Sequence, residues 1–111
     1  MKAQQYTPQV GSYTLQSRSA LWNDLYAFVT QRERAYNSVH PKRLVHFEAI
    51  GRLKRAIDFH RFDGLESQCR ILLRNEAELR CLIPGINSRY HANAQRRVDA
   101  MVQFCKQYLN Q

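Results

Sequence analysis

The spacing of apolar and polar positions predicts four helices. Apolar residues recur at intervals of three and four over about 19–36, 41–61, 63–82 and 88–109, as they do along one face of an α-helix. No stretch alternates apolar and polar side chains with a period of two over the length of an ordinary strand. The sequence therefore predicts an all-α fold.

The segment 41–61 has the clearest pattern. Pro41 suits a first helical position, where its missing N–H costs nothing. At about 100° per residue, one continuous arc holds Val45, His46, Ala49, Ile50, Leu53, Ala56, Ile57 and His60. Three large apolar residues fall outside this arc and indicate a second contact surface. We take them as candidate partner-binding residues: Leu44, Phe47 and Phe59.

The ends of the segments fit a bundle of short-linked helices. Asp63 and Glu66 have the spacing of a capping box, in which each side chain binds the other residue's backbone N–H. Residues 1–16 are interrupted by Pro8 and Gly11 and predict a flexible or extended N-terminal arm. Four helices with short connections pack most simply as an antiparallel four-helix bundle. We expect residues 17–111 to form this single helical domain.

Composition narrows the class of protein. The 111 residues suffice for one hydrophobic core, and the apolar runs are too short to cross a bilayer. The N-terminal residues lack the apolar stretch of a secretory signal. The three cysteines are widely spaced and odd in number, which is typical of reduced thiols. We therefore expect a cytoplasmic protein without a membrane partner.

Charge suggests what the surface binds. Seventeen cations, thirteen of them arginines, oppose nine acids and give a net charge of +8. Between residues 32 and 61, eight cations face three acids, and a smaller cluster begins the fourth helix. Arginine forks pair bidentately with phosphate or carboxylate. The candidate nucleic-acid-binding residues are Lys42, Arg43, Arg52, Lys54, Arg55, Arg61, Arg89, Arg96 and Arg97.

Two partners fit this charge. The first is nucleic acid, DNA or RNA, because each phosphate contact releases counterions. The second is an acidic protein surface, bound by a small basic module such as an inhibitor or a helical subunit of a nucleoprotein assembly. In size and charge the chain resembles the helical small subunits of CRISPR effector complexes. Homo-oligomers or larger nucleoprotein assemblies fit either partner.

One enzymatic alternative rests on a short pattern. The stretches from Arg55 to His60 and from Arg34 to His40 match the R-x(4–6)-H spacing. They resemble the motif of the HEPN ribonucleases, which are small helical bundles, and the resemblance implies RNA cleavage by these side chains. The family favours a polar residue after the arginine, whereas this chain has alanine at both places. At about 100° per residue, Arg55 and His60 also lie about 140° apart on a helix.

Other catalytic patterns are missing from the sequence. It has no glycine-rich phosphate loop, no G-x-S-x-G and no H-E-x-x-H. His46 and His60 are too far apart along one helix to share a metal. We therefore expect a non-enzymatic accessory protein without metal or cofactor.

Overall fold

The computed structural model describes residues 9–10, 13–14, 18–39 and 44–110, with side chains over 20–38 and 48–110. Within these ranges the chain forms five helices and one short pair of strands. The helices are α1 (Arg18–Val39), α2 (Leu44–Phe59), α3 (Leu65–Arg74), α4 (Glu76–Cys81) and α5 (His91–Leu109). The strands are β1 (Gln9–Val10) and β2 (Tyr13–Thr14). The predicted helical character is confirmed. No helix in the described ranges combines the length and apolarity needed to span a bilayer.

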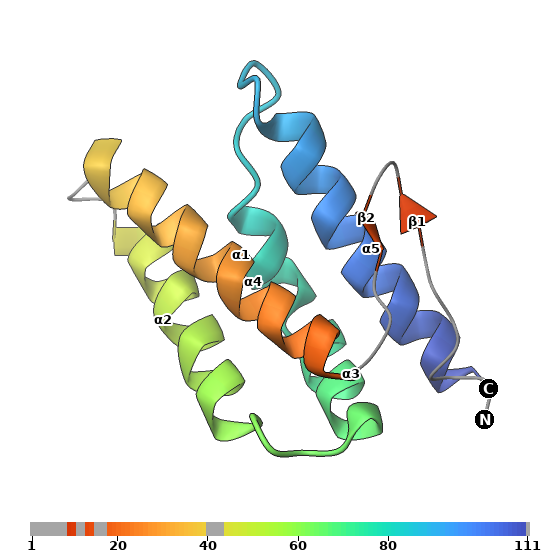
Figure 1. Ribbon diagram of the computed structural model, residues 1–111. Coiled ribbons are helices and arrows are strands. Elements are labelled where there is room, and N and C mark those ends of the chain that lie inside the picture. The colour runs from red at the N-terminus through yellow and green to blue at the C-terminus, as the bar shows by residue number, and fades with distance from the viewer. Residues whose placement is uncertain (1–8, 11–12, 15–17, 40–43, 111) are drawn as a thin grey trace.

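The helices pack as neighbouring pairs. α1 lies beside α2, and α3 packs on α5, while α4 contacts both α2 and α5 and so joins the two pairs (Figure 1). The strands form an antiparallel pair, with Val10 opposite Tyr13, beside α5. Two residues per strand are too few for a period-two pattern to predict. The rest of the expected N-terminal arm lies outside the described residues.

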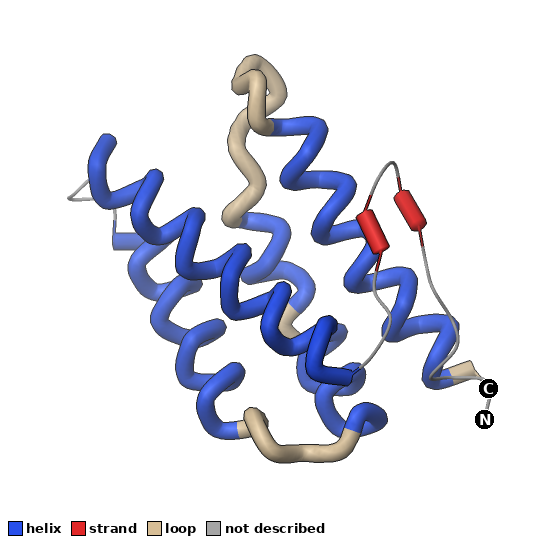
Figure 2. The backbone as a smooth tube through the Cα atoms, in the orientation of Figure 1, coloured by secondary structure: helices blue, strands red, loops and turns tan. Residues whose placement is uncertain are grey.

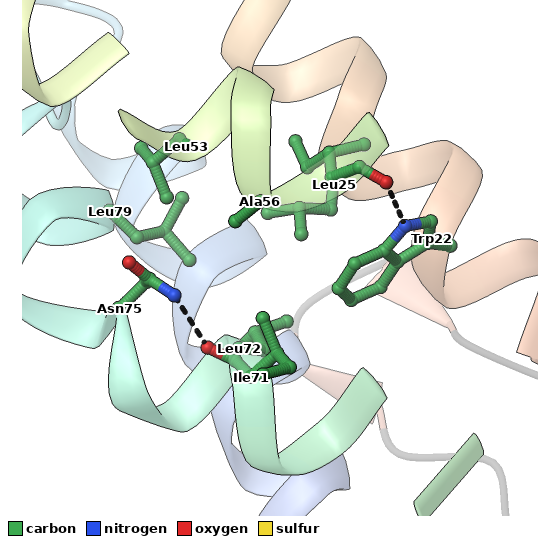
Figure 3. A pocket seen from close by; sticks show the side chains of 9 residues that line it. Trp22, Leu25, Leu53, Ala56, Ile71, Leu72, Asn75 and Leu79 are labelled. Atoms are coloured by element: carbon green, nitrogen blue, oxygen red, sulfur yellow. Dashed lines mark hydrogen bonds between the residues drawn. The ribbon is translucent and has the colours of Figure 1, made fainter. Parts of the chain in front are cut away.

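The core takes its side chains from all five helices. Its largest fully buried members include Phe28, Leu21, Ile50, Ile57, Leu72, Leu79, Met101 and Phe104. Trp22 donates from Nε1 to the carbonyl oxygen of Ile57 at 2.9 Å, which ties α1 to the last turn of α2 (Figure 3). The cavity beside this bond measures about 10 Å³ and is lined mostly by apolar side chains. It has room for one water molecule at most.

Two faces differ from the prediction. Helical spacing groups Tyr26 with the buried side of α1, yet it is 40% exposed. On α5, helical spacing groups Val98, Met101 and Cys105 on one buried face, and Ala100 and Phe104 are buried as well. The reason is that α5 has neighbours on two sides, α3 with α4 and the strand pair.

The predicted third helix is two helices, α3 and α4, separated by Asn75. The Asn75 side chain donates from Nδ2 to the carbonyl oxygen of Ile71 at 2.9 Å (Figure 3). Its backbone N–H is shared between the carbonyl oxygens of Ile71 and Leu72. An asparagine that binds nearby backbone competes with the regular helical ladder. The break between α3 and α4 coincides with this side-chain hydrogen bond.

The predicted capping box is wrong. α3 begins after Gly64, which occupies the N-cap position and supplies no side-chain hydrogen bond. The Asp63 carboxylate instead lies 2.7 Å from His60 Nδ1 and accepts a hydrogen bond from the Ser67 hydroxyl at 2.8 Å. Glu66 pairs with Arg70 along the helix. The helix starts one residue later than the pattern requires, which places Asp63 one residue before the N-cap.

Candidate binding surfaces

Two cations of the α2 face predicted to bind phosphate are already paired with carboxylates, some of which belong to neighbouring helices. Lys54 Nζ lies 2.9 Å from the Glu33 carboxylate on α1. The Arg52 guanidinium lies 3.6 Å from Glu48 and 3.8 Å from Glu78, which belongs to α4. Counting charges along the chain missed Glu78, because it is distant in sequence and close in space.

The remaining cations of that face fall into three groups. Arg61 pairs with Asp58 at 3.0 Å, and its guanidinium carbon lies 5.7 Å from the centre of the Tyr26 ring. Arg55 is exposed and has no carboxylate partner among the described residues. Lys42 and Arg43 lie outside the described residues. In the described part of the predicted basic face, Arg55 is therefore the one cation without a carboxylate partner.

Every acidic residue of the chain pairs with an arginine, lysine or histidine. Arg97, predicted to contact phosphate, is one of these partners. It lies 2.9 Å from the Asp24 carboxylate and donates to Gln31 at 3.1 Å, so it joins α5 to α1. Burial raises the pKa of Asp24 above its ordinary value, and Arg97 partly opposes this. Arg97 therefore has a structural role.

The described cations without a carboxylate partner are spread over several helices. They are Arg32, Arg34, Arg55, Arg74, Arg89, Arg96 and Lys106. Of these, Arg32 is half-buried and donates from Nε to the carbonyl oxygen of Leu82 at 3.0 Å, which ties α1 to the end of α4. The surface positive charge is thus dispersed rather than gathered on α2.

The α4–α5 loop and the start of α5 carry two of the unmatched arginines. No acidic residue occurs between Glu78 and Asp99 in the sequence. Arg89 donates to the Tyr90 hydroxyl at 2.7 Å and lies 4.9 Å from the centre of its ring. Arg96 donates to the side-chain oxygen of Asn93. We call Ile86, Arg89, Tyr90 and Arg96 the loop surface.

Backbone and side-chain bonds order this loop, which projects at one end of the molecule (Figure 2). His91 Nδ1 lies 2.7 Å from the carbonyl oxygen of Pro84 and closes the loop at its base. Ser88 N–H binds the Gly85 carbonyl oxygen at 2.9 Å, and the Ser88 hydroxyl accepts the Tyr90 N–H at 3.1 Å. Ile86 and Tyr90 stay 81% and 53% exposed. The loop therefore presents an apolar, an aromatic and two cationic side chains together.

A second exposed surface lies at the turn between α2 and α3, at the opposite end of the molecule (Figure 1). Phe59 and Phe62 are 83% and 89% exposed. A shallow hollow beside Phe59 is lined by Arg55, Ala56, Asp58, Phe59 and His60. We call Tyr26, Arg55, Asp58, Phe59, Arg61 and Phe62 the aromatic corner.

The turn of the aromatic corner is held from inside by Gln68. This side chain is 1% exposed and donates from Nε2 to the carbonyl oxygens of His60 and Arg61, both at 3.1 Å. The hydrogen bonds from His60 and Ser67 lower the pKa of Asp63 below its ordinary value. Phe59 and Phe62 therefore stand on a turn fixed by several hydrogen bonds.

The structure describes only one of the three side chains predicted to bind a partner. Phe59 lies on the surface as expected, whereas the side chains of Leu44 and Phe47 lie outside the described residues. Sequence reasoning missed Phe62, although its position in a charged turn beyond the apolar arc was a usable signal. It also missed the buried Gln68, because a glutamine on a helix is usually solvated.

The arginine and histidine of the R-x(4–6)-H pattern come nearer to one another than expected. Arg55 and His60 line the same hollow, although His60 Nδ1 is bonded to Asp63. His40 lies outside the described residues. Across the described residues, no group of three or more His, Cys, Asp or Glu is placed to hold a metal ion.

No known family model, curated protein or solved structure matches this chain.

Proposed function

We propose that this chain is a non-enzymatic nucleic-acid-binding protein that contacts phosphates through the loop surface rather than through α2. One observation carries the proposal: Arg89 and Arg96 lie in an acid-free stretch and have no carboxylate partner among the described residues. A phosphate gains most from a cation whose charge is not already matched. Arg52, Lys54 and Arg97 would first have to leave their carboxylates.

The neighbours of these arginines suit the same ligand. Tyr90 is half exposed beside the Arg89 guanidinium and offers a ring on which an unpaired base can stack. Asn87 and Ser88 add uncharged hydrogen-bonding groups to the loop. The ligand would be recognised mainly by its backbone and by stacking.

In this proposal the fold is an antiparallel four-helix bundle in which α3 and α4 count as one helix bent at Asn75. The chain between two helices then lies at an end of the bundle. The α4–α5 loop is such a connection, so a nucleic acid can reach it without displacing a helix.

The test is fluorescence anisotropy at low salt with labelled duplex DNA, single-stranded DNA and hairpin RNA. The double variant Arg89→Gln with Arg96→Gln should bind roughly tenfold more weakly, because each arginine supplies a charge-assisted hydrogen bond to phosphate. The matched control is Arg74→Gln with Lys106→Gln. It removes two exposed cations that also lack carboxylate partners but lie away from the loop.

Three results would count against the proposal. The intact chain binds none of the probes, or both double variants lose the same affinity, or the RNA probe is cut during the assay. Equal losses would mean that net charge alone attracts the probe. Cutting that disappears in Arg55→Ala or His60→Ala would instead support the HEPN-like alternative.

The second candidate function is docking on an acidic protein surface. Ile86 favours it, because an 81% exposed aliphatic side chain beside unmatched arginines resembles the anchors of protein interfaces. A stoichiometric protein that copurifies after nuclease treatment, and that Ile86→Ser and Arg89→Gln both release, would favour this candidate over nucleic acid.

A further inference from the structure

We infer that the aromatic corner is a contact between two copies of this chain. The inference concerns the end of the molecule opposite the loop surface and does not depend on the proposed nucleic-acid binding. Two nearly fully exposed phenylalanines stand within four residues, with the 40% exposed Tyr26 on the neighbouring helix. Gathered apolar exposure of this kind on a small protein marks an interaction site.

The charges of the corner favour a second copy as the occupant. Copies of a chain with a net charge of +8 repel one another over most of their surface. Around the aromatic corner, however, the cations Arg55 and Arg61 occur with two carboxylates: Asp58, which pairs with Arg61, and Asp63, which binds His60. The repulsion between two copies is therefore least where their corners meet.

The same charges are self-complementary. In a twofold contact each patch meets its own copy, so a patch with both signs of charge can pair across the axis. Arg55 is exposed without a carboxylate partner among the described residues, and Asp58 remains 65% exposed although it pairs with Arg61 of its own chain at 3.0 Å. Arg55 of one copy can therefore share the Asp58 carboxylate of the other with Arg61, with the phenylalanines buried between them.

The turn between α2 and α3 is also rigid before any partner binds. Gln68 fixes the backbone of His60 and Arg61 from inside the core, so little ordering is needed on association. A preformed surface loses less entropy when it binds. The loop surface stays at the far end of each copy, free for its own ligand (Figure 1).

The test is the molar mass of the full chain by light scattering after size exclusion, over a wide range of micromolar concentrations. We expect a species of twice 13.1 kDa that becomes more abundant as salt screens the repulsion. The double variant Phe59→Ser with Phe62→Ser should have the mass of one chain. Its circular dichroism and melting temperature should stay those of the wild-type monomer, since both side chains are exposed.

The matched control is Ile86→Ser, which removes an equally exposed apolar side chain at the other end and should leave the dimer intact. A second pair probes the charges: Arg55→Glu should weaken the dimer, and adding Asp58→Arg should restore it. A wild-type chain with the mass of one copy at every concentration overturns the inference. So does a dimer that survives loss of both phenylalanines. Neither result affects the loop surface, because nucleic-acid binding is measured separately.

Discussion

At the scale of single residues, Gln68 shows how a buried polar side chain can organise a surface turn. Its amide satisfies two backbone carbonyls. We predict that Gln68→Met, which keeps the volume and removes both hydrogen bonds, lowers the free energy of unfolding by about 1–3 kcal/mol. Urea denaturation measures this, with Gln95→Met on the exposed side of α5 as the control. Equal losses in the two variants would show that the bonds to the turn contribute nothing.

Asp63 gives the same turn a dependence on pH. Its pKa is lowered in the folded chain, chiefly by the hydrogen bond from His60 and then by that from Ser67. A lowered carboxyl pKa stabilises the fold above the ordinary value of 3.8, and this stabilisation is lost as the pH falls through the folded-state pKa. We predict that Asp63→Asn unfolds in less urea than the wild type at neutral pH. The difference should shrink as the pH falls below 3.8. A difference of the same size at both pH values would contradict this linkage.

At the scale of elements, periodicity predicted the helices and most of their buried faces. Ala49, Ile50, Leu53 and Ile57 are all buried where the pattern placed them, because apolar spacing is a local property that reports the face a helix must cover. The break at Asn75 was not predictable in this way, since the apolar spacing over 63–82 continues across it.

The candidate sites depended on partners that lie far apart in the sequence. Lys54 and Arg52 looked unmatched in a linear count of charges, yet Glu33 and Glu78 reach them from other helices. Arg97 is matched by Asp24, 73 residues earlier. The exposure of Phe59 was predictable because it follows from its position outside the apolar arc. Ion pairs between helices, by contrast, can be predicted only once it is known how the helices pack.

At the scale of the whole molecule, net charge and surface pattern carry different information. The excess of +8 draws any polyanion toward the chain, whichever side chains supply it. The site at which the polyanion binds depends on which cations lack a carboxylate partner in the folded chain. In the described part of the chain, carboxylates are interleaved with the cations of α2 and absent between residues 79 and 98.

Salt dependence distinguishes the two surfaces. For duplex DNA, each phosphate contact contributes about 0.9 to the slope of log affinity against log salt. We predict that Arg89→Gln with Arg96→Gln lowers this slope by about two units, because two such contacts are lost. Arg52→Gln with Lys54→Gln should leave the slope close to that of the wild type, because those cations stay paired with carboxylates and so make no phosphate contact that releases counterions from the DNA. Anisotropy titrations over a salt series measure both slopes. The opposite pattern is a reduced slope for the α2 variant alone. It would mean that the phosphates contact the α2 face, as the count of charges along the sequence first predicted.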